Sequence, residues 1–133
     1  MINVIYGVKG SGKTERIIAA ANAKAEESKG VVLYVTDRKE HSLAVNKKVR
    51  FIDVNEYGIK CEKCCVPFFK GLLAGNYDIT DIFVDGLAKF IGMKIEDMEK
   101  IYTELDLLSQ DHEVDFTLTV SSGSVPDYMK KYI

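Results

Sequence analysis

Short apolar segments alternate with longer amphipathic segments along the chain. Residues 2–6 and 31–35 are apolar and rich in β-branched side chains, which predicts two buried strands. Between them, apolar residues recur at helical spacing over 13–28, and Gly30 follows where a helix is expected to stop. A strand, a glycine-rich turn, a helix and a strand in this order form a βαβ unit, which predicts a parallel sheet.

The rest of the chain continues this alternation. A short edge strand is expected over residues 49–54, and buried strands are expected over 82–84 and 116–120. Helices are expected over 62–74 and 94–110, with a further short helix near the end of the sequence. The predicted fold class is α/β, a three-layer sandwich in which helices cover both faces of a mostly parallel sheet.

Length and composition agree with one folded domain. The 133 residues match the size of a single domain, and 47% hydrophobic residues exclude a disordered chain. No apolar run approaches the roughly 18 residues that cross a membrane, and the first segment resembles a strand more than a signal peptide. We therefore expect one domain over residues 1–133, a cytoplasmic location and no membrane partner.

Charge is distributed unevenly along the chain. Residues 1–66 contain 12 lysines and arginines against 8 acidic residues, whereas residues 67–133 contain 6 against 12. A basic half can attract a polyanion, but the cluster of Lys47, Lys48 and Arg50 lacks interleaved aromatic residues for base stacking. Surface lysines and one phosphate site are the favoured interpretation, and a nucleic acid partner is not expected.

The turn after the first strand fits the pattern G-x-x-x-x-G-K-[S/T] at every fixed position. The residues of this phosphate-binding pattern are Gly7, Val8, Lys9, Gly10, Ser11, Gly12, Lys13 and Thr14. Its glycines let backbone N–H groups turn toward phosphate oxygens, Lys13 can reach the β- and γ-phosphates, and the Thr14 hydroxyl can ligate Mg²⁺. The pattern predicts a site for a nucleotide with Mg²⁺; a glycine-rich turn with a fortuitous lysine is the weaker alternative.

A second carboxylate is needed at the end of an apolar strand to hold the magnesium ion through its water shell. Asp85 directly follows the apolar residues 82–84 and is the predicted magnesium residue. Asp81 precedes the same apolar run, so we expect it at the opposite end of the sheet.

These segments resemble those of the phosphate-loop (P-loop) NTPase superfamily, and within it the RecA/KaiC-like ATPases. The matched segments are GVKGSGKT, VVLYV with the turn DRKE, IFVDG, and FTLTV with the two serines after it. The chain also resembles short bacterial phosphate-loop proteins, some of which are labelled twitching-motility ATPases. The resemblance implies a RecA-like core that binds ATP and Mg²⁺.

The residue that orients the attacking water is less evident. Many related ATPases have a glutamate after the magnesium aspartate, but here Asp85 is followed by Gly86. RecA-like members place a glutamate after the strand that follows the phosphate-loop helix, and this position corresponds to Asp37 or, less directly, Glu40. The resemblance therefore implies Asp37 or Glu40 as the catalytic residue, with a solvated turn as the alternative.

Several other polar residues have no single predicted role. Ser121 and Ser122 can offer a hydroxyl to the γ-phosphate or simply end a strand. His41 and His112 lie in highly polar segments, and we expect both on exposed turns.

Three cysteines, Cys61, Cys64 and Cys65, lie close together. A single C-x-x-C is half of a tetrahedral zinc site, and it is also compatible with a redox pair. Because the cysteines follow helical spacing with Phe68 and Leu72, packing in the core is the favoured interpretation.

The functional hypothesis is an ATP-binding protein with slow or partner-dependent hydrolysis, since no arginine finger is evident. In a homo-oligomer, Arg38 or Arg50 can complete the site of a neighbouring copy. The alternatives are a non-catalytic nucleotide-dependent switch and a small nucleoside or nucleotide kinase. ATP is favoured over GTP because no guanine-reading N-K-x-D stretch is present.

Overall fold

Five strands form one sheet in the computed structural model, which describes all 133 residues, and every neighbouring pair of strands is parallel. The strands are β1 (Ile2–Gly7), β2 (Val31–Thr36), β3 (Val49–Asp53), β4 (Ile79–Asp85) and β5 (Asp115–Ser121). Their order across the sheet is β1-β5-β4-β2-β3. All five predicted strands are confirmed, and β3 lies at an edge as expected.

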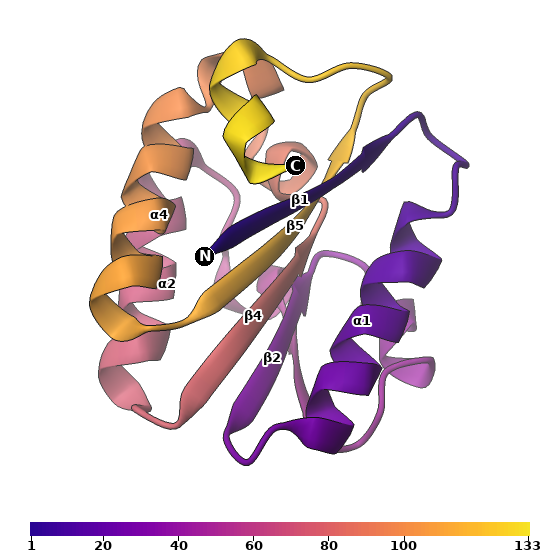
Figure 1. The fold of residues 1–133 in the computed structure, drawn as a ribbon, viewed down its shortest axis with the longest axis vertical. Helices are drawn as coiled ribbons and strands as arrows, with labels where there is room; N and C mark the ends of the chain where they lie inside the picture. The colour runs from indigo at the N-terminus through magenta and orange to yellow at the C-terminus, as the bar shows by residue number, and fades with distance from the viewer.

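Helices cover both faces of the sheet (Figure 1). The α-helices are α1 (Lys13–Glu27), α2 (Glu62–Gly75), α3 (Leu87–Ile91) and α4 (Glu99–His112). Short 3₁₀ turns occupy Lys39–Leu43, Val54–Tyr57, Ile95–Asp97 and Asp127–Tyr132. Helix α1 lies against one face, and α2 and α4 lie against the other. None of these helices has the length and apolar character to span a bilayer. With helices on both faces of a parallel sheet, the chain has the predicted α/β fold.

Alternating side chains of the buried strands supply a core on each face. Val32 and Tyr34 of β2 pack with Ile17 on the α1 side, whereas Leu33 and Val35 join the larger core under α2 and α4. Because both faces are covered, the strands are almost continuously apolar, as in other parallel sheets.

The segment after β4 differs from the prediction. One helix was expected over residues 94–110, but Lys94 is extended, Ile95–Asp97 forms a 3₁₀ turn, and α4 begins only at Glu99. Helix α3 was not predicted, because its five residues are too few for helical periodicity to be recognised. At the end of the chain, the expected short helix is a 3₁₀ helix.

The connections of β1 and β4 leave the sheet on opposite faces. The chain passes from β1 to β2 through α1, and from β4 to β5 through α3 and α4 on the other side. In parallel α/β sheets, a crevice for ligands forms at the carboxyl ends of strands where the connections diverge in this way. Asp81 pairs with Asp115 at the opposite end of the sheet, as expected.

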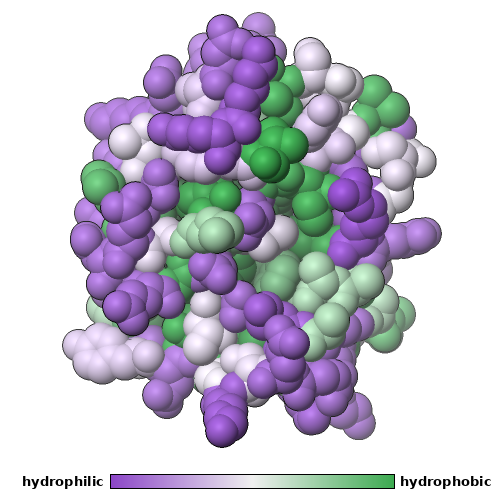
Figure 2. Space-filling view, viewed as in Figure 1, coloured by the Kyte–Doolittle hydropathy of each residue, from purple (hydrophilic) through white to green (hydrophobic).

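Strand β1 forms one edge of the sheet, with β5 as its single neighbour. In the space-filling view, apolar residues lie in the middle of this face of the molecule and hydrophilic residues surround them (Figure 2). The loop that follows β1 lies at this edge, and its residues Val8 to Ser11 are exposed.

Candidate functional site

A polar cleft of about 670 Å³ lies at the carboxyl ends of the strands. None of the residues that line it is hydrophobic. They come from four separate segments and are Lys9, Gly10, Gly12, Lys13, Thr14, Glu15, Asp37, Arg38, His41, Asp85, Gly86, Lys89, Thr119 and Ser121. The fold thus brings Asp37, Asp85 and most of the glycine-rich loop to one place.

The glycines of the loop after β1 meet conformational and steric requirements. Gly10 and Gly12 have φ angles of 84° and 87°, in the left-handed region that glycine adopts without strain. A Cβ atom on Gly7 would collide with the Ser11 hydroxyl oxygen. The Ser11 N–H donates to the Val8 carbonyl at 3.1 Å and closes the turn. Gly7, Val8 and Ser11 therefore shape the loop without lining the cleft.

Lys13 begins helix α1 and is almost entirely buried. Its Nζ atom donates to the Val8 carbonyl oxygen at 3.0 Å, so the ammonium group lies across the loop. No side chain caps the start of α1, and Gly12 is the residue before its first turn. The free N–H groups and the helix dipole add positive potential beside Lys13 and Thr14.

Asp85 ends β4 and is held in a defined orientation. Its Oδ1 atom accepts a hydrogen bond from the Thr119 hydroxyl at 2.8 Å, and that hydroxyl oxygen accepts from the Gly86 N–H at 3.0 Å. Its Oδ2 atom lies 3.7 Å from His41 Nδ1. The carboxylate is therefore oriented by the neighbouring strand β5 and by the turn after β2.

His41 lies in the polar cleft, so the expectation of an exposed turn residue is wrong. Only 13% of its side chain is exposed, and its Nδ1 atom lies 3.2 Å from the Tyr34 hydroxyl. Burial raises the pKa of Tyr34, and the charge of Asp85 adds to this effect, so the phenol stays neutral. The 3₁₀ turn Lys39–Leu43 directs His41 inward, and no polar pattern in the sequence indicates this direction. His112 is exposed, as expected.

The two predicted catalytic carboxylates occupy different environments. Asp37 lines the cleft, and a Cβ atom on Gly86 would lie 3.8 Å from its Oδ1 atom. The backbone carbonyl of Asp37 accepts a hydrogen bond from Asn55 Nδ2 at 2.9 Å, which fixes the turn. Glu40 does not line the cleft; its Oε1 atom pairs with Arg38 Nε at 3.1 Å on the exposed surface.

Two further cations line the cleft in addition to the residues of the loop. Lys89 comes from α3, the helix that the sequence did not predict, and the left-handed Gly86 turns the chain from β4 into this helix. Arg38 comes from the turn after β2 of the same chain. Arg50 lies elsewhere, on the edge strand β3. Ser121 lines the cleft, whereas Ser122 lines a neighbouring hollow.

The cysteines do not pack together in the core. Cys65 is buried as expected, but Cys61 is exposed and Cys64 is half-buried. No three side chains of His, Cys, Asp or Glu converge as ligands of a metal ion, so the fold supplies no complete protein ligand set for zinc.

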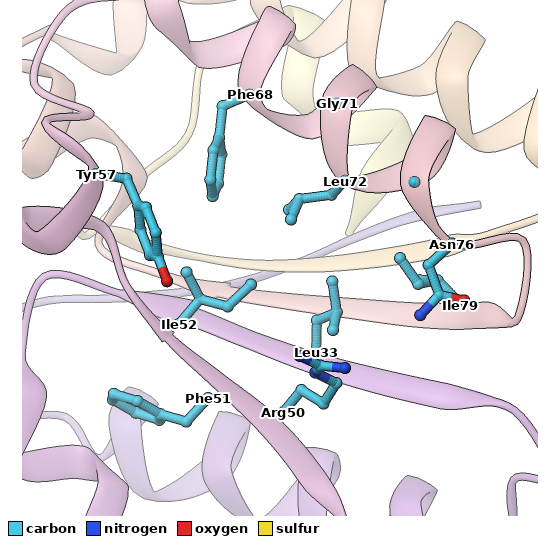
Figure 3. Close-up of a pocket in the computed structure, with 11 residues that line it drawn as sticks. Leu33, Arg50, Phe51, Ile52, Tyr57, Phe68, Gly71, Leu72, Asn76 and Ile79 are labelled. Atoms are coloured by element: carbon cyan, nitrogen blue, oxygen red, sulfur yellow. The ribbon is translucent and has the colours of Figure 1, made fainter.

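An apolar groove of about 450 Å³ lies between the edge strand β3 and helix α2, and we call it the edge groove (Figure 3). Ile52, Leu33, Phe68 and Leu72 project into it, with Tyr57 at one end. No acidic residue lines this groove, and Arg50 is its only charged residue. It therefore lacks the carboxylates that a magnesium site requires.

A scan against models of known protein families gives no match, and a search of curated proteins finds no similar sequence. At the level of fold, the structure establishes an α/β protein with a five-stranded parallel sheet and flanking helices.

Proposed function

We propose that the protein binds ATP with Mg²⁺ in the polar cleft and hydrolyses it slowly, as a RecA-like phosphate-loop protein. The observation that carries this proposal is the convergence of Lys13, Thr14 and Asp85 in one cleft without apolar lining. A triphosphate with its metal ion needs cations and N–H groups around the phosphate oxygens. It also needs oxygen ligands around the metal ion.

The donor set fits this ligand. The N–H groups of the loop and of the first turn of α1 would contact phosphate oxygens, and the Lys13 ammonium would neutralise the β- and γ-phosphates. Hard oxygen ligands suit Mg²⁺, so the Thr14 hydroxyl and the Asp85 carboxylate would hold the ion together with water and phosphate. The ion supplies charge neutralisation at the phosphates when it is bound.

Asp37 is the better candidate for orienting the attacking water. Its carboxylate faces the cleft beside Gly86, whereas the Glu40 carboxylate is 64% exposed and paired with Arg38. Aspartate is shorter than the glutamate that RecA-like enzymes use, so the distance from Asp37 to a water beside the γ-phosphate would be greater. A displaced base lowers the rate steeply, so we expect hydrolysis to be slow.

Arg38 and Lys89 are candidates for stabilising the charge that develops on the transferred phosphate. Both line the cleft of their own chain, so a partner is not needed to supply them. The pair between Arg38 and Glu40 is exposed and weak, and it leaves Arg38 free to turn toward a phosphate. Arg50 lines the edge groove and not the cleft, so it could stabilise this charge only in the cleft of a neighbouring copy.

Phosphate release from Mg²⁺-ATP, measured over a wide range of protein concentrations, tests this proposal. The expected result is a slow release that is proportional to protein concentration and absent from Lys13→Ala. A rate that rises faster than concentration would show that a second copy completes the site. Equal release by the wild type and Lys13→Ala would contradict the proposal.

The same experiment separates the alternative functions. A nucleotide-dependent switch would bind ATP and ADP with no phosphate release above the Lys13→Ala background. A nucleoside or nucleotide kinase would transfer phosphate when a panel of nucleosides and monophosphates is added. Competition by GTP measures the preference for adenine.

A further inference from the structure

Cys61 and Cys64 lie side by side at the start of helix α2. Cys61 is the residue that precedes the helix, and Cys64 lies in its first turn. Their Sγ atoms are 2.7 Å apart, whereas a disulfide bond requires about 2.0 Å. Cys61 is exposed and Cys64 is half-buried, so small molecules in solution can reach the pair. The two sulfur atoms therefore need only a small movement to form a bond.

The surroundings of Cys64 favour its thiolate form. Its Sγ atom accepts a hydrogen bond from the Cys61 N–H at 3.2 Å, and the Cys61 thiol lies within donating distance. Partial burial opposes the charge, but these hydrogen bonds hold the pKa of the Cys64 thiol below its usual value. The start of α2 adds the positive end of the helix dipole. We therefore assign Cys64, whose sulfur atom these donors surround, as the attacking thiolate.

Cys65 differs sharply from its neighbour. It is fully buried in the core under α2 and α4, and burial raises the pKa of its thiol to about 12. At neutral pH only a very small fraction of such a thiol is ionised, so Cys65 is inert toward electrophiles. The fold thus separates one buried structural cysteine from an accessible pair.

We propose that Cys61 and Cys64 are a redox-active dithiol that forms a reversible intramolecular disulfide by exchange with a low-molecular-weight disulfide. The Cys64 thiolate attacks one sulfur of that disulfide, forms a mixed disulfide and releases one thiolate. Cys61 then loses its proton and attacks Cys64 Sγ, which forms the Cys61–Cys64 bond and releases the second thiolate. Two protein thiols are oxidised, one small disulfide is reduced to two thiols, and an added dithiol reverses both steps.

The proposed dithiol is independent of the polar cleft and of the proposed nucleotide function. The reacting groups lie at the start of α2, and neither cysteine lines the cleft. Failure of one proposal therefore leaves the other intact.

Peptide mapping of the full chain tests the proposal directly. The reduced protein is incubated with oxidised glutathione, the remaining thiols are alkylated, and the chain is cut with trypsin without reduction. Cleavage after Lys60, Lys63 and Lys70 places Cys61 and Cys64 on different peptides, so their bond appears as two linked peptides. The expected product contains the Cys61–Cys64 bond with Cys65 alkylated after unfolding, and dithiothreitol restores both thiols.

Serine variants assign the roles of the two cysteines. Cys61→Ser retains a residue that caps a helix well, so we expect it to fold. In this variant Cys64 should form a stable mixed disulfide with glutathione, and iodoacetamide should alkylate it more than about a hundredfold faster than Cys65 at pH 7. Cys64→Ser should form no intramolecular bond, whereas the control Cys65→Ala should form it as the wild type does.

Three results would overturn the proposal. The first is a folded wild-type chain that keeps both thiols after prolonged exposure to oxidised glutathione. The second is a bond from Cys61 to Cys65 in the fragment spectra of the linked peptides. The third is one zinc ion per chain in protein purified without chelator, which would assign the two thiols to a metal instead.

Discussion

The polar cleft at the carboxyl ends of the strands and the edge groove beside β3 are both open to solvent, but different residues line them. Carboxylates, lysines, glycines and hydroxyls line the cleft, whereas Leu33, Ile52, Phe68 and Leu72 line the groove. The cleft is larger, at about 670 Å³ against about 450 Å³. Of these two hollows, only the cleft combines several cations with carboxylates.

The two hollows also have different structural origins. The cleft forms where the connections after β1 and β4 leave opposite faces of the sheet, a position set by topology. The groove lies beside the edge strand β3, where Gly71 and Gly75 of α2 present no side chain to fill it. A hollow of this kind follows from packing, so its size alone does not indicate a ligand.

Among the carboxylates, replacement of the one proposed to orient water should have the largest effect on turnover. Asp37→Asn removes the charge that faces the cleft, and we expect turnover of Mg²⁺-ATP to fall by about a hundredfold. Glu40→Gln is the matched control, because Glu40 lies outside the cleft, and its turnover should stay within about twofold of the wild type. The reverse order of these two effects would assign the catalytic role to Glu40.

The proposed role of Asp85 as a magnesium ligand can be tested by the dependence of nucleotide affinity on the metal. Asp85→Asn keeps an oxygen that accepts from Thr119 but loses the negative charge, so the gain in affinity from Mg²⁺ should fall by about 10- to 100-fold. Titrations with and without a chelator measure this gain. Asp81→Asn, at the opposite end of β4, should keep it unchanged. If Asp85→Asn also keeps it, Asp85 does not hold the ion.

The edge groove should contribute to stability and not to nucleotide binding. Phe68 lines the groove and packs edge-to-face on Phe69 at a ring distance of 5.2 Å. We expect Phe68→Ala to lower the free energy of unfolding by about 1–3 kcal/mol, because its side chain is only partly buried. Urea unfolding measures this loss, and calorimetry should give unchanged affinity for Mg²⁺-ATP. A loss of affinity in the folded variant would make the groove part of the nucleotide site.

The smallest expected effect concerns Asp81, which is buried far from the cleft. Burial raises its pKa, so the folded state holds the proton more tightly than the unfolded state. Its favourable contribution is complete below the unfolded pKa of about 3.9 and is lost as pH rises through the folded pKa. Asp81→Asn should therefore stabilise the protein at pH 7 by less than about 1 kcal/mol.

Urea titrations at pH 7 and pH 3 test the sign of this effect. The advantage of Asp81→Asn should disappear at pH 3, where the wild-type carboxyl is protonated in both states. Thr80 Oγ1 donates to Asp81 at 2.8 Å and can donate to an asparagine oxygen as well, so no hydrogen bond is lost. A larger advantage at pH 3 than at pH 7 would contradict the assignment.

Sequence reasoning predicted the features that depend on neighbouring residues. The strand, the glycine-rich loop and α1 follow one another directly, so pattern and local geometry agree over residues 2–27. The position of Asp85 at the carboxyl end of a strand was predicted because a polar residue follows an apolar run, and this signal is also local.

Features that depend on strand order, on a 3₁₀ turn or on a very short helix were not predictable. Thr119 contacts Asp85 because β5 lies beside β4, and no pattern in the sequence specifies this neighbour. His41 lies in the cleft because a 3₁₀ turn directs it toward Asp85 and Tyr34. Lys89 lies on a helix of five residues, which is too short to leave a periodic signal. These residues became visible only when separate segments were brought together in the fold.

The binding of Mg²⁺ with a slowly hydrolysed ATP analogue, measured by calorimetry for the wild type and Lys13→Ala, tests the central claim most directly. Thermal unfolding should first establish that Lys13→Ala is folded, because Lys13 is buried and donates a hydrogen bond to the Val8 carbonyl oxygen. We predict one site per wild-type chain and an affinity at least about a hundredfold lower in Lys13→Ala, since that variant lacks the charge facing the phosphates. Equal affinity in the two folded proteins, or no binding by the wild type, would contradict the claim.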